Sequence, residues 1–170
     1  GLIQKTGLEA ADVEDVIVGC AFPEGEQGFN IARLGVLLAD LPLTVGGMTV
    51  NRFCGSSMSS VQIAMGQIAI GAGEVFICAG VESMSRVPMM GFNPLPNPEL
   101  AKKSAAYMSM GETAENVATK YQIPRADQEA FAVESQRRAA AARDAGKFSD
   151  EIVPIQTKAG VVSEDGTIRP

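Results

Sequence analysis

The sequence predicts an α/β fold built on a parallel-rich sheet, and two observations support this prediction. Three apolar runs with many β-branched residues have the character of buried strands: Asp15 to Phe22, Gly46 to Phe53 and Glu74 to Val81. The segments between them show helical periodicity, and strands joined by short helical crossovers pair in parallel. Because parallel sheets bind ligands at the carboxyl ends of their strands, functional residues are expected after these runs.

Helices are predicted before and between the strands. The first segment, Gly1 to Ala11, has the character of the tail of a helix interrupted at Gly7, and its abrupt start suggests a cut chain. Asn30 is a suitable N-cap for a helix from Ile31 to Ala39, whose apolar residues form one stripe. The segment from Cys54 to Ile70 combines small and apolar residues, which predicts a helix that is buried on most sides.

The character of the chain changes after residue 85. Four prolines lie between Arg86 and Pro98 and indicate an irregular excursion. We therefore expect an α/β core over residues 1–85 and a second, mainly helical subdomain over residues 86–170.

Helices dominate the predicted second subdomain. Ser109 and Glu112 have the spacing of a capping box and predict the start of a helix. A longer alanine-rich helix is expected to follow and to reach Ala145. Glu151 to Ile155 has the pattern of a short strand. The remainder, residues 158–170, is polar and turn-rich and stops without a helix or strand to close it. Three arginines of the longer helix are expected on a solvated face: Arg137, Arg138 and Arg143.

Composition narrows the functional classes. The net charge is −6 and the sequence has no basic block, which argues against binding to nucleic acids or membrane surfaces. No apolar run approaches the roughly 20 residues of a membrane span. The three cysteines, Cys20, Cys54 and Cys78, lack metal-ligand spacing, so we expect no metal site and reduced thiols in a cytoplasmic compartment. Histidine is absent, so the usual general base is missing.

Cys54 is the residue around which the predicted chemistry is organised. It lies where the second apolar run gives way to a helix, so its sulfur is expected near unpaired backbone N–H groups and the positive end of the helix dipole. Such a position favours the thiolate, and the same N–H groups stabilise an oxyanion on a carbonyl that the sulfur attacks. The alternative is a small buried residue, as most free cysteines are. Cys20 and Cys78 lie inside apolar runs and are expected to be structural.

Three motifs give the sequence a specific resemblance. They are V-N-R-F-C-G-S-S-M around Cys54, A-G-V-E-S-M-S-R-V-P around Glu82 and M-G-E-T-A-E-N from Met110. In this order they resemble the thiolase family, the enzymes that make or cleave 3-ketoacyl-CoA thioesters. The resemblance extends over essentially the whole chain but covers only part of a thiolase, which has an opening strand before this segment and a second catalytic half after it. It implies a partial thiolase-like layered fold with an inserted, mainly helical loop subdomain over the CoA side.

The resemblance also implies roles for single residues. Cys54 corresponds to the family's acyl-accepting nucleophile, with its backbone N–H in an oxyanion hole, and Glu82 to a structural acid without a catalytic role. Met110 corresponds in position to a methionine of the acyl pocket, and Ser109 stands where several relatives have histidine. Arg169 is similar in position to an arginine near the CoA nucleotide.

The chemistry that the resemblance implies is acyl transfer between a cysteine thioester and CoA, with cleavage or formation of a carbon–carbon bond. Coenzyme A then acts as a substrate, and no cofactor is bound tightly. A homodimer or tetramer is implied, paired through the strand before the nucleophile. The C-G-S-S-M form of the motif resembles degradative 3-ketoacyl-CoA thiolases more than biosynthetic acetoacetyl-CoA enzymes.

The sequence departs from the family pattern in its catalytic complement. Thiolases use a histidine in G-H-P, a second histidine in an N-E-H-F-type motif and a second cysteine near C-x-G-G-G, and this sequence contains none of the three motifs. We therefore expect the isolated chain to be inactive. Two other interpretations remain open: a non-catalytic module for folding or oligomerisation, and a ketosynthase-like condensing segment.

Overall fold

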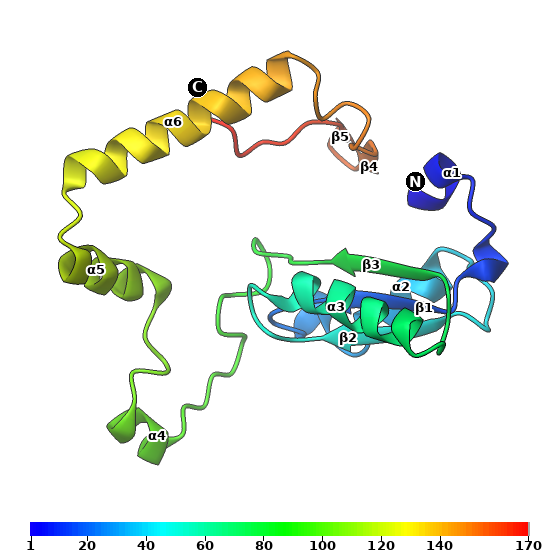
Figure 1. Ribbon diagram of the computed structural model, residues 1–170, viewed down its shortest axis with the longest axis horizontal. Coiled ribbons are helices and arrows are strands. Elements are labelled where there is room, and N and C mark those ends of the chain that lie inside the picture. Colours follow the sequence, from blue (N-terminus) through cyan, green and yellow to red (C-terminus); the bar gives the residue numbers. More distant parts are fainter. Residues whose placement is uncertain (170) are drawn as a thin grey trace. The chain divides into compact units, whose positions relative to one another are not determined.

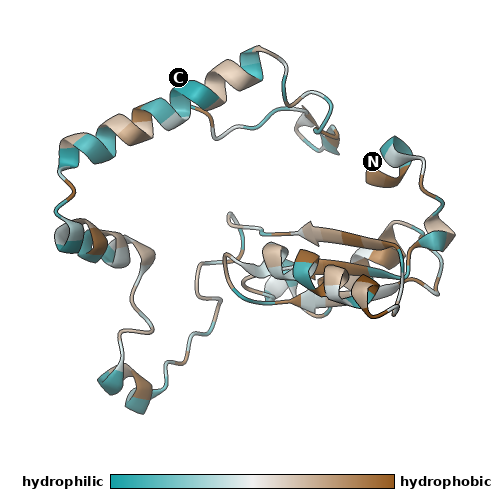
Figure 2. Ribbon diagram, viewed as in Figure 1, coloured by the Kyte–Doolittle hydropathy of each residue, from teal (hydrophilic) through white to brown (hydrophobic). Residues whose placement is uncertain are grey.

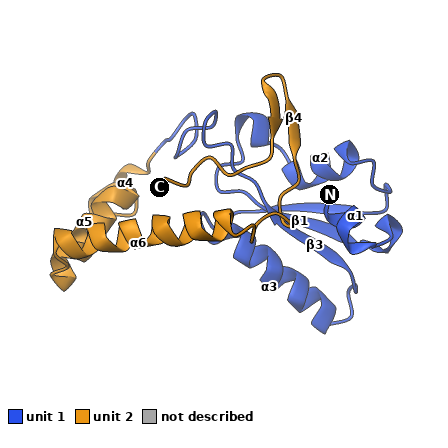
Figure 3. Ribbon diagram, turned by 90° about the horizontal axis from the view of Figure 1, so that it is seen from above, with its two compact units in different colours: residues 1–95 blue, residues 96–170 orange. Residues whose placement is uncertain are grey.

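The computed structural model describes residues 1–169 and divides into two units, residues 1–95 and the residues from 96 onward (Figure 3). Most of the proline-rich segment belongs with the first unit, where the Phe92 N–H donates to Glu24 Oε2 at 2.7 Å. The boundary predicted after residue 85, between the α/β core and the CoA-covering subdomain, stays a prediction.

A three-stranded parallel sheet forms the centre of the first unit. Its strands are β1 (Asp15–Gly19), β2 (Gly46–Val50) and β3 (Phe76–Gly80), and β1 lies between the other two (Figure 1). The three strands start in register, because Asp15 is paired with both Gly46 and Phe76. This confirms the predicted parallel neighbours. Each strand is shorter than its apolar run, because the residues that follow leave the ladder to form loops.

One helix covers each face of this sheet. α2 (Ile31–Leu38) packs against β1 and β2, and α3 (Ser56–Ala69) packs against β1 and β3 (Figure 3). Val16 and Val18 of β1 belong to the buried cluster on the α2 side, and Ile17, whose side chain points the other way, is fully buried as well. Both faces of the central strand are therefore buried, as expected for a parallel sheet.

Local signals place the first helices much as predicted. The Asn30 side chain accepts from the Arg33 N–H at 3.3 Å and caps α2. α1 (Leu2–Thr6) ends at Gly7, whose φ of 66° is the left-handed conformation that glycine favours at helix ends. The start of α2 and the end of α1 are therefore each set by a single residue that the sequence identifies.

α3 begins two residues later than predicted, and its predicted burial on most sides is wrong. The helix begins at Ser56, because Cys54 and the residue after it lie in the preceding turn. Several small residues of α3 are buried, whereas four of its large apolar side chains are at least half exposed (apolar stretches of the ribbon are brown in Figure 2): Met58, Val61, Met65 and Ile68. Within residues 1–95 the sheet covers one side of the helix, and nothing in this unit covers these four side chains.

The described part of the second unit contains helices and a hairpin. They are α4 (Pro98–Lys103), α5 (Met110–Tyr121), α6 (Arg125–Asp144), β4 (Ile155–Thr157) and β5 (Gly160–Val162). The two longer helices confirm the prediction, and Ser109 and Glu112 form the predicted capping box. No helix in residues 1–169 is both long and apolar enough to cross a membrane.

One prediction for the second unit is wrong, and two of its short elements were not predicted. The irregular segment predicted from Arg86 to Pro98 is confirmed, because residues 86–97 form no helix or strand. α4, which was not predicted, begins at Pro98, where Asn97 accepts two backbone N–H groups at 3.0 Å. The strand predicted at Glu151 to Ile155 begins only at its last residue, because the first two N–H groups bond back to the Phe148 carbonyl. The polar tail contains β5, which was not predicted and which pairs antiparallel with β4.

The arginines of α6 pair with carboxylates on their own helix. Arg137 and Arg138 contact Glu134 at 2.6 and 2.7 Å, and Arg143 contacts Asp144 at 2.8 Å. Hydrogen bonds from Arg137 and then Arg138 lower the pKa of Glu134 to about 2. Arg137 and Arg138 are exposed, which agrees with the predicted solvated helix face, whereas Arg143 is only partly exposed.

Candidate active site

Cys54 lies in a tight turn between β2 and α3. The turn spans residues 51–55, and Cys54 is exposed two residues before the first residue of α3. A bond from the Ser56 N–H to the Phe53 carbonyl, at 3.0 Å, closes the turn. Cys54 thus stands at the carboxyl end of the sheet and beside the N-terminus of a helix, the location that the sequence predicts.

Phe53 adopts a left-handed backbone conformation directly before Cys54. Its φ is 46°, which a bulky L-residue adopts only at a cost in free energy. The Ser56 hydroxyl holds this conformation, because it donates to the Phe53 carbonyl at 2.6 Å and accepts from the Arg52 N–H at 2.9 Å. The Phe53 ring also packs on Phe22, with ring centroids 5.8 Å apart. Side-chain contacts, rather than a glycine, therefore fix the turn.

The backbone N–H of Cys54 has no hydrogen-bond acceptor among residues 1–169. The Cys54 thiol makes no hydrogen bond there either. An exposed sulfur and an uncommitted N–H thus occur at the same residue. The sulfur can attack a carbonyl carbon, and the N–H can bind the oxygen that becomes negative.

Two glycines at strand ends allow α3 to approach the sheet. A Cβ atom on Gly19, the last residue of β1, would lie 2.4 Å from the Ser57 nitrogen. One on Gly80, the last residue of β3, would lie 2.1 Å from the Ser57 hydroxyl. A hydroxyl can rotate away whereas a backbone nitrogen cannot, so Gly19 is the stricter requirement. These glycines let the first turn of α3, and with it Cys54, lie against the ends of two strands.

The other two cysteines are less accessible than Cys54. Cys20 directly follows β1 and is fully buried, and burial, followed by the charge of Glu82, raises the pKa of its thiol. Cys78 of β3 is half-buried, and its thiol donates to the Ser60 carbonyl at 3.5 Å. Their surroundings agree with structural roles.

Glu82 ties together the loops that follow β1 and β3. Its carboxylate accepts from the Ala21 N–H and, at 3.1 Å, from the Gln27 side chain. Gln27 is buried, donates to the Phe22 carbonyl at 2.7 Å and accepts from the Ser83 N–H at 2.6 Å. Every one of these bonds joins one loop to another or to itself, which agrees with a structural acid.

A comparison with protein families decides what kind of protein this site belongs to. The family model for the N-terminal domain of thiolases matches residues 1–170. The chain belongs to the thiolase family. Its exposed cysteine therefore lies in a thiolase N-terminal domain.

Bacterial thiolases are similar to this chain over nearly all of its length. The 3-ketoacyl-CoA thiolase of Bacillus subtilis is 49% identical over 164 residues, which are 96% of this chain and 42% of that protein. The 3-ketoacyl-CoA thiolase of Psychrobacter cryohalolentis is 45% identical over 99% of this chain and 45% of its own length. The 3-oxoadipyl-CoA/3-oxo-5,6-dehydrosuberyl-CoA thiolase of Escherichia coli is 41% identical over 99% of this chain and 48% of its own length. The chain spans less than half the length of these relatives.

The other site residues expected from the thiolase resemblance lie in the second unit. Ser109 caps α5, and Met110, the first residue of that helix, is 62% exposed. The Ser109 hydroxyl donates to the Glu112 carboxylate at 2.8 Å and lowers the pKa of Glu112. Arg169 is exposed, and its backbone N–H donates to the Gln136 side chain at 2.7 Å. Ser109 and Met110 thus lie together at one helix start, and Arg169 lies beside α6.

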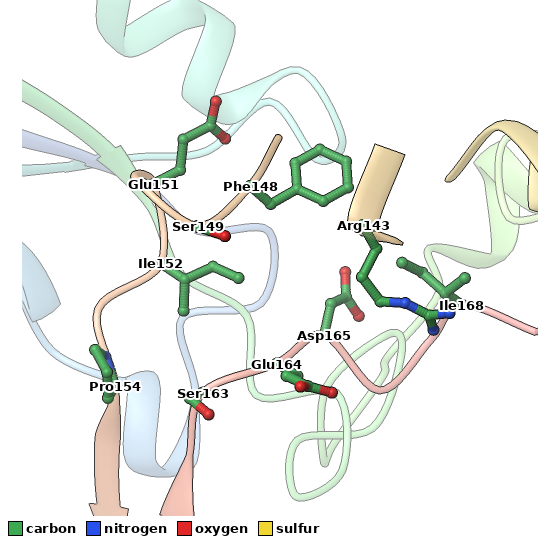
Figure 4. A pocket seen from close by; sticks show the side chains of 10 residues that line it. All are labelled: Arg143, Phe148, Ser149, Glu151, Ile152, Pro154, Ser163, Glu164, Asp165 and Ile168. Atoms are coloured by element: carbon green, nitrogen blue, oxygen red, sulfur yellow. The ribbon is translucent and has the colours of Figure 1, made fainter. Parts of the chain in front are cut away.

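A cavity in the second unit of this thiolase chain is unsuited to the phosphates of CoA. It has a volume of about 490 Å³ and lies where the end of α6 meets the segments on both sides of the hairpin (Figure 4). Glu151, Glu164 and Asp165 line it together with Arg143. Hydrogen bonds from Thr167 lower the pKa of Asp165 and so favour its charged form. Three carboxylates against one guanidinium repel an anionic ligand.

Asn51 is a residue of the turn to which the sequence reasoning assigned no role. Its side chain donates to the Ala21 carbonyl and accepts from the Phe53 N–H, both at 2.9 Å. An asparagine three residues before the cysteine is the available signal, because asparagine side chains readily bind nearby backbone groups in turns.

Proposed function

We propose that Cys54 accepts the acyl group in a thiolase reaction. The observation that carries this proposal is the exposed Cys54 thiol at a helix start, next to a backbone N–H without an acceptor in residues 1–169. Membership of the thiolase family supports it. Because the chain spans less than half of its relatives' length, the reaction is proposed for it as the part of the machinery that carries the nucleophile.

The proposed reaction splits a 3-ketoacyl-CoA with a second CoA. The Cys54 sulfur bonds to the keto carbon C3, the C2–C3 bond breaks, and C2 takes up a proton as acetyl-CoA leaves. The acyl group remains on Cys54 as a thioester. The sulfur of free CoA then bonds to the acyl carbon, the bond to Cys54 breaks, and the CoA thiol proton passes to the Cys54 sulfur. The reverse direction forms the carbon–carbon bond.

Coenzyme A thioesters are the proposed substrates, and no tightly bound cofactor is needed. Two of the similar proteins are named for 3-ketoacyl-CoA and one for 3-oxoadipyl-CoA, so the proposal covers 3-ketoacyl-CoA thioesters as a class. Within the second unit, Met110 and Ser109 are proposed to line the acyl pocket and Arg169 to lie near the CoA nucleotide. Three free thiols support a reducing, cytoplasmic compartment.

Limited alkylation tests the assignment of the nucleophile. With little iodoacetamide near neutral pH, peptide mapping is expected to find the label on Cys54 well before Cys78 or Cys20, because reactivity follows exposure and thiolate fraction. The unfolded chain is the control and should be labelled evenly at the three positions. Even labelling in the folded chain would remove Cys54 as the nucleophile.

We also propose that the chain associates with itself. β2 and β3 are the outer strands of the sheet in residues 1–95, and unpaired strand edges favour association. The thiolase resemblance points to β2, the strand before the nucleophile. The four exposed apolar side chains of α3 form a second surface that favours association.

Sedimentation velocity at micromolar concentration is expected to detect dimers or larger species. Met65→Lys, which places a charge on the exposed apolar face of α3, is expected to lower their share. Gln62→Lys is the matched control, because it adds the same charge at an exposed polar position of the same helix. A compact monomer at every concentration of the unchanged chain would contradict the proposal.

A further inference from the structure

The Asn51 side chain makes two hydrogen bonds that join separate parts of the first unit. Its Nδ2 donates to the Ala21 carbonyl at 2.9 Å, and its Oδ1 accepts from the Phe53 N–H at 2.9 Å. The first bond reaches the loop after β1, and the second reaches the residue directly before Cys54. Asn51 is exposed, so burial in a core does not impose this geometry.

The Ala21 end of this link is held independently of Asn51. The Ala21 N–H donates to the Glu82 carboxylate, and the carbonyl of the next residue, Phe22, accepts from Gln27 at 2.7 Å. Gln27 is buried and also bonds to Glu82 at 3.1 Å. The loop after β1 therefore offers Asn51 an acceptor in a fixed place.

The Phe53 end of the link is a strained backbone that needs support. Phe53 has a φ of 46°, and residues in such conformations persist only where their surroundings hold them. Ser56 binds the Phe53 carbonyl and Asn51 binds its N–H, so the two side chains hold both sides of this residue. A return of Phe53 to a relaxed conformation would redirect the sulfur and the backbone N–H of Cys54.

We infer that Asn51 is a positioning residue for Cys54. It connects the fixed loop after β1 to the turn that carries the thiol and the N–H used in acyl transfer, without touching the substrate itself. This inference rests on the proposed role of Cys54. Acylation needs the sulfur and the N–H in their correct places, whereas alkylation needs only an accessible sulfur. Loss of Asn51 therefore impairs acylation more than alkylation.

Two reagents separate these effects in the 170-residue chain. S-phenyl thioacetate acetylates the thiol: the Cys54 sulfur bonds to the acetyl carbon, thiophenol leaves, and the thiol proton passes to the leaving sulfur. Iodoacetamide alkylates the same sulfur. Asn51→Ala is expected to slow acetylation of Cys54 by about tenfold or more, because it displaces an oxyanion donor whose complete removal costs about a hundredfold to a thousandfold. Alkylation of Cys54 is expected to change much less.

Labelling of the buried Cys20 reports whether the variant is folded. If Asn51→Ala exposes Cys20 and is therefore unfolded, Asn51→Asp is measured instead. Its carboxylate can still accept from the Phe53 N–H but has no donor for the Ala21 carbonyl. It is measured at a salt concentration that screens its added charge. Slower acetylation with Cys20 protected is the expected result.

Three outcomes are decisive. Acetylation at the unchanged rate in a folded Asn51 variant overturns the inference. An equal loss of acetylation and alkylation also overturns it, because reduced access to the sulfur then explains both. If the unchanged chain does not acetylate Cys54 ahead of Cys78, the proposed role of Cys54 fails instead, and with it the basis for the inference.

Discussion

Given acetoacetyl-CoA and CoA, the 170-residue chain is expected to form acetyl-CoA no faster than its Cys54→Ser variant. The sequence contains no histidine, and within residues 1–169 no base is hydrogen-bonded to the Cys54 thiol. Both halves of the reaction need a proton moved at the reacting atoms, and such transfers require a positioned acid or base. Loss of one group from a catalytic unit lowers turnover by about ten-thousandfold to a millionfold.

The assay needs a positive control and a second readout. The full-length relative from Bacillus subtilis, in the same buffer, shows that the conditions permit thiolysis. Mass spectrometry of the chain then distinguishes a Cys54 that forms no thioester from one that forms it without passing it on. Acetyl-CoA formation that rises with chain concentration and disappears in Cys54→Ser would show that turnover proceeds without a histidine.

Features set by neighbours in the sequence could be predicted. Asn30 and Ser109 cap their helices as expected, because each side chain binds a backbone N–H only three residues away. The position of Cys54 could be predicted for the same reason, since an apolar strand followed by small helical residues defines a strand end and a helix start. The parallel order of the three strands follows from the short crossovers between them.

The details of the candidate site depend on contacts between distant residues. The bond from Asn51 to Ala21 spans 30 residues, and the one from Ala21 to Glu82 spans 61, so no local pattern reveals them. The conformation of Phe53 also opposes local preference, because a bulky residue rarely adopts a positive φ. Contacts with Ser56 and Asn51 stabilise what the residue type alone disfavours.

The burial of α3 was wrongly predicted for a related reason. Apolar periodicity shows which side chains of a helix suit a buried place, but not whether a partner covers them. Within residues 1–95 the sheet covers the small residues of α3, while Met58 and Met65 stay exposed. The hairpin after α6 was missed because its strands have only three residues each, too few to show an alternating pattern.

Gly19→Ala is expected to destabilise the first unit by about 3 kcal/mol, near the upper end for overpacked positions. The new Cβ would lie 2.4 Å from the Ser57 nitrogen and 2.6 Å from the Ser56 carbonyl carbon, and neither atom can move without the whole first turn of α3. Urea unfolding measures the loss of stability. The same displacement carries the Cys54 turn away from the strand ends, so acetylation of Cys54 is expected to slow in the fraction that stays folded.

Gly66→Ala is the matched control, because it adds the same methyl group to α3 itself. Nothing lies within 4 Å of a Cβ at Gly66, so the substitution is expected to leave stability unchanged or raise it by up to about 1 kcal/mol through better helix propensity. A loss of stability in Gly19→Ala without a loss in Gly66→Ala would locate the cost in the contact between the strand end and the helix rather than in the added methyl. If Gly19→Ala is as stable as the unchanged chain, the predicted clash is contradicted, because the first turn of α3 could then move away from the strand end without loss of stability. In that case the sheet does not hold the cysteine turn in place.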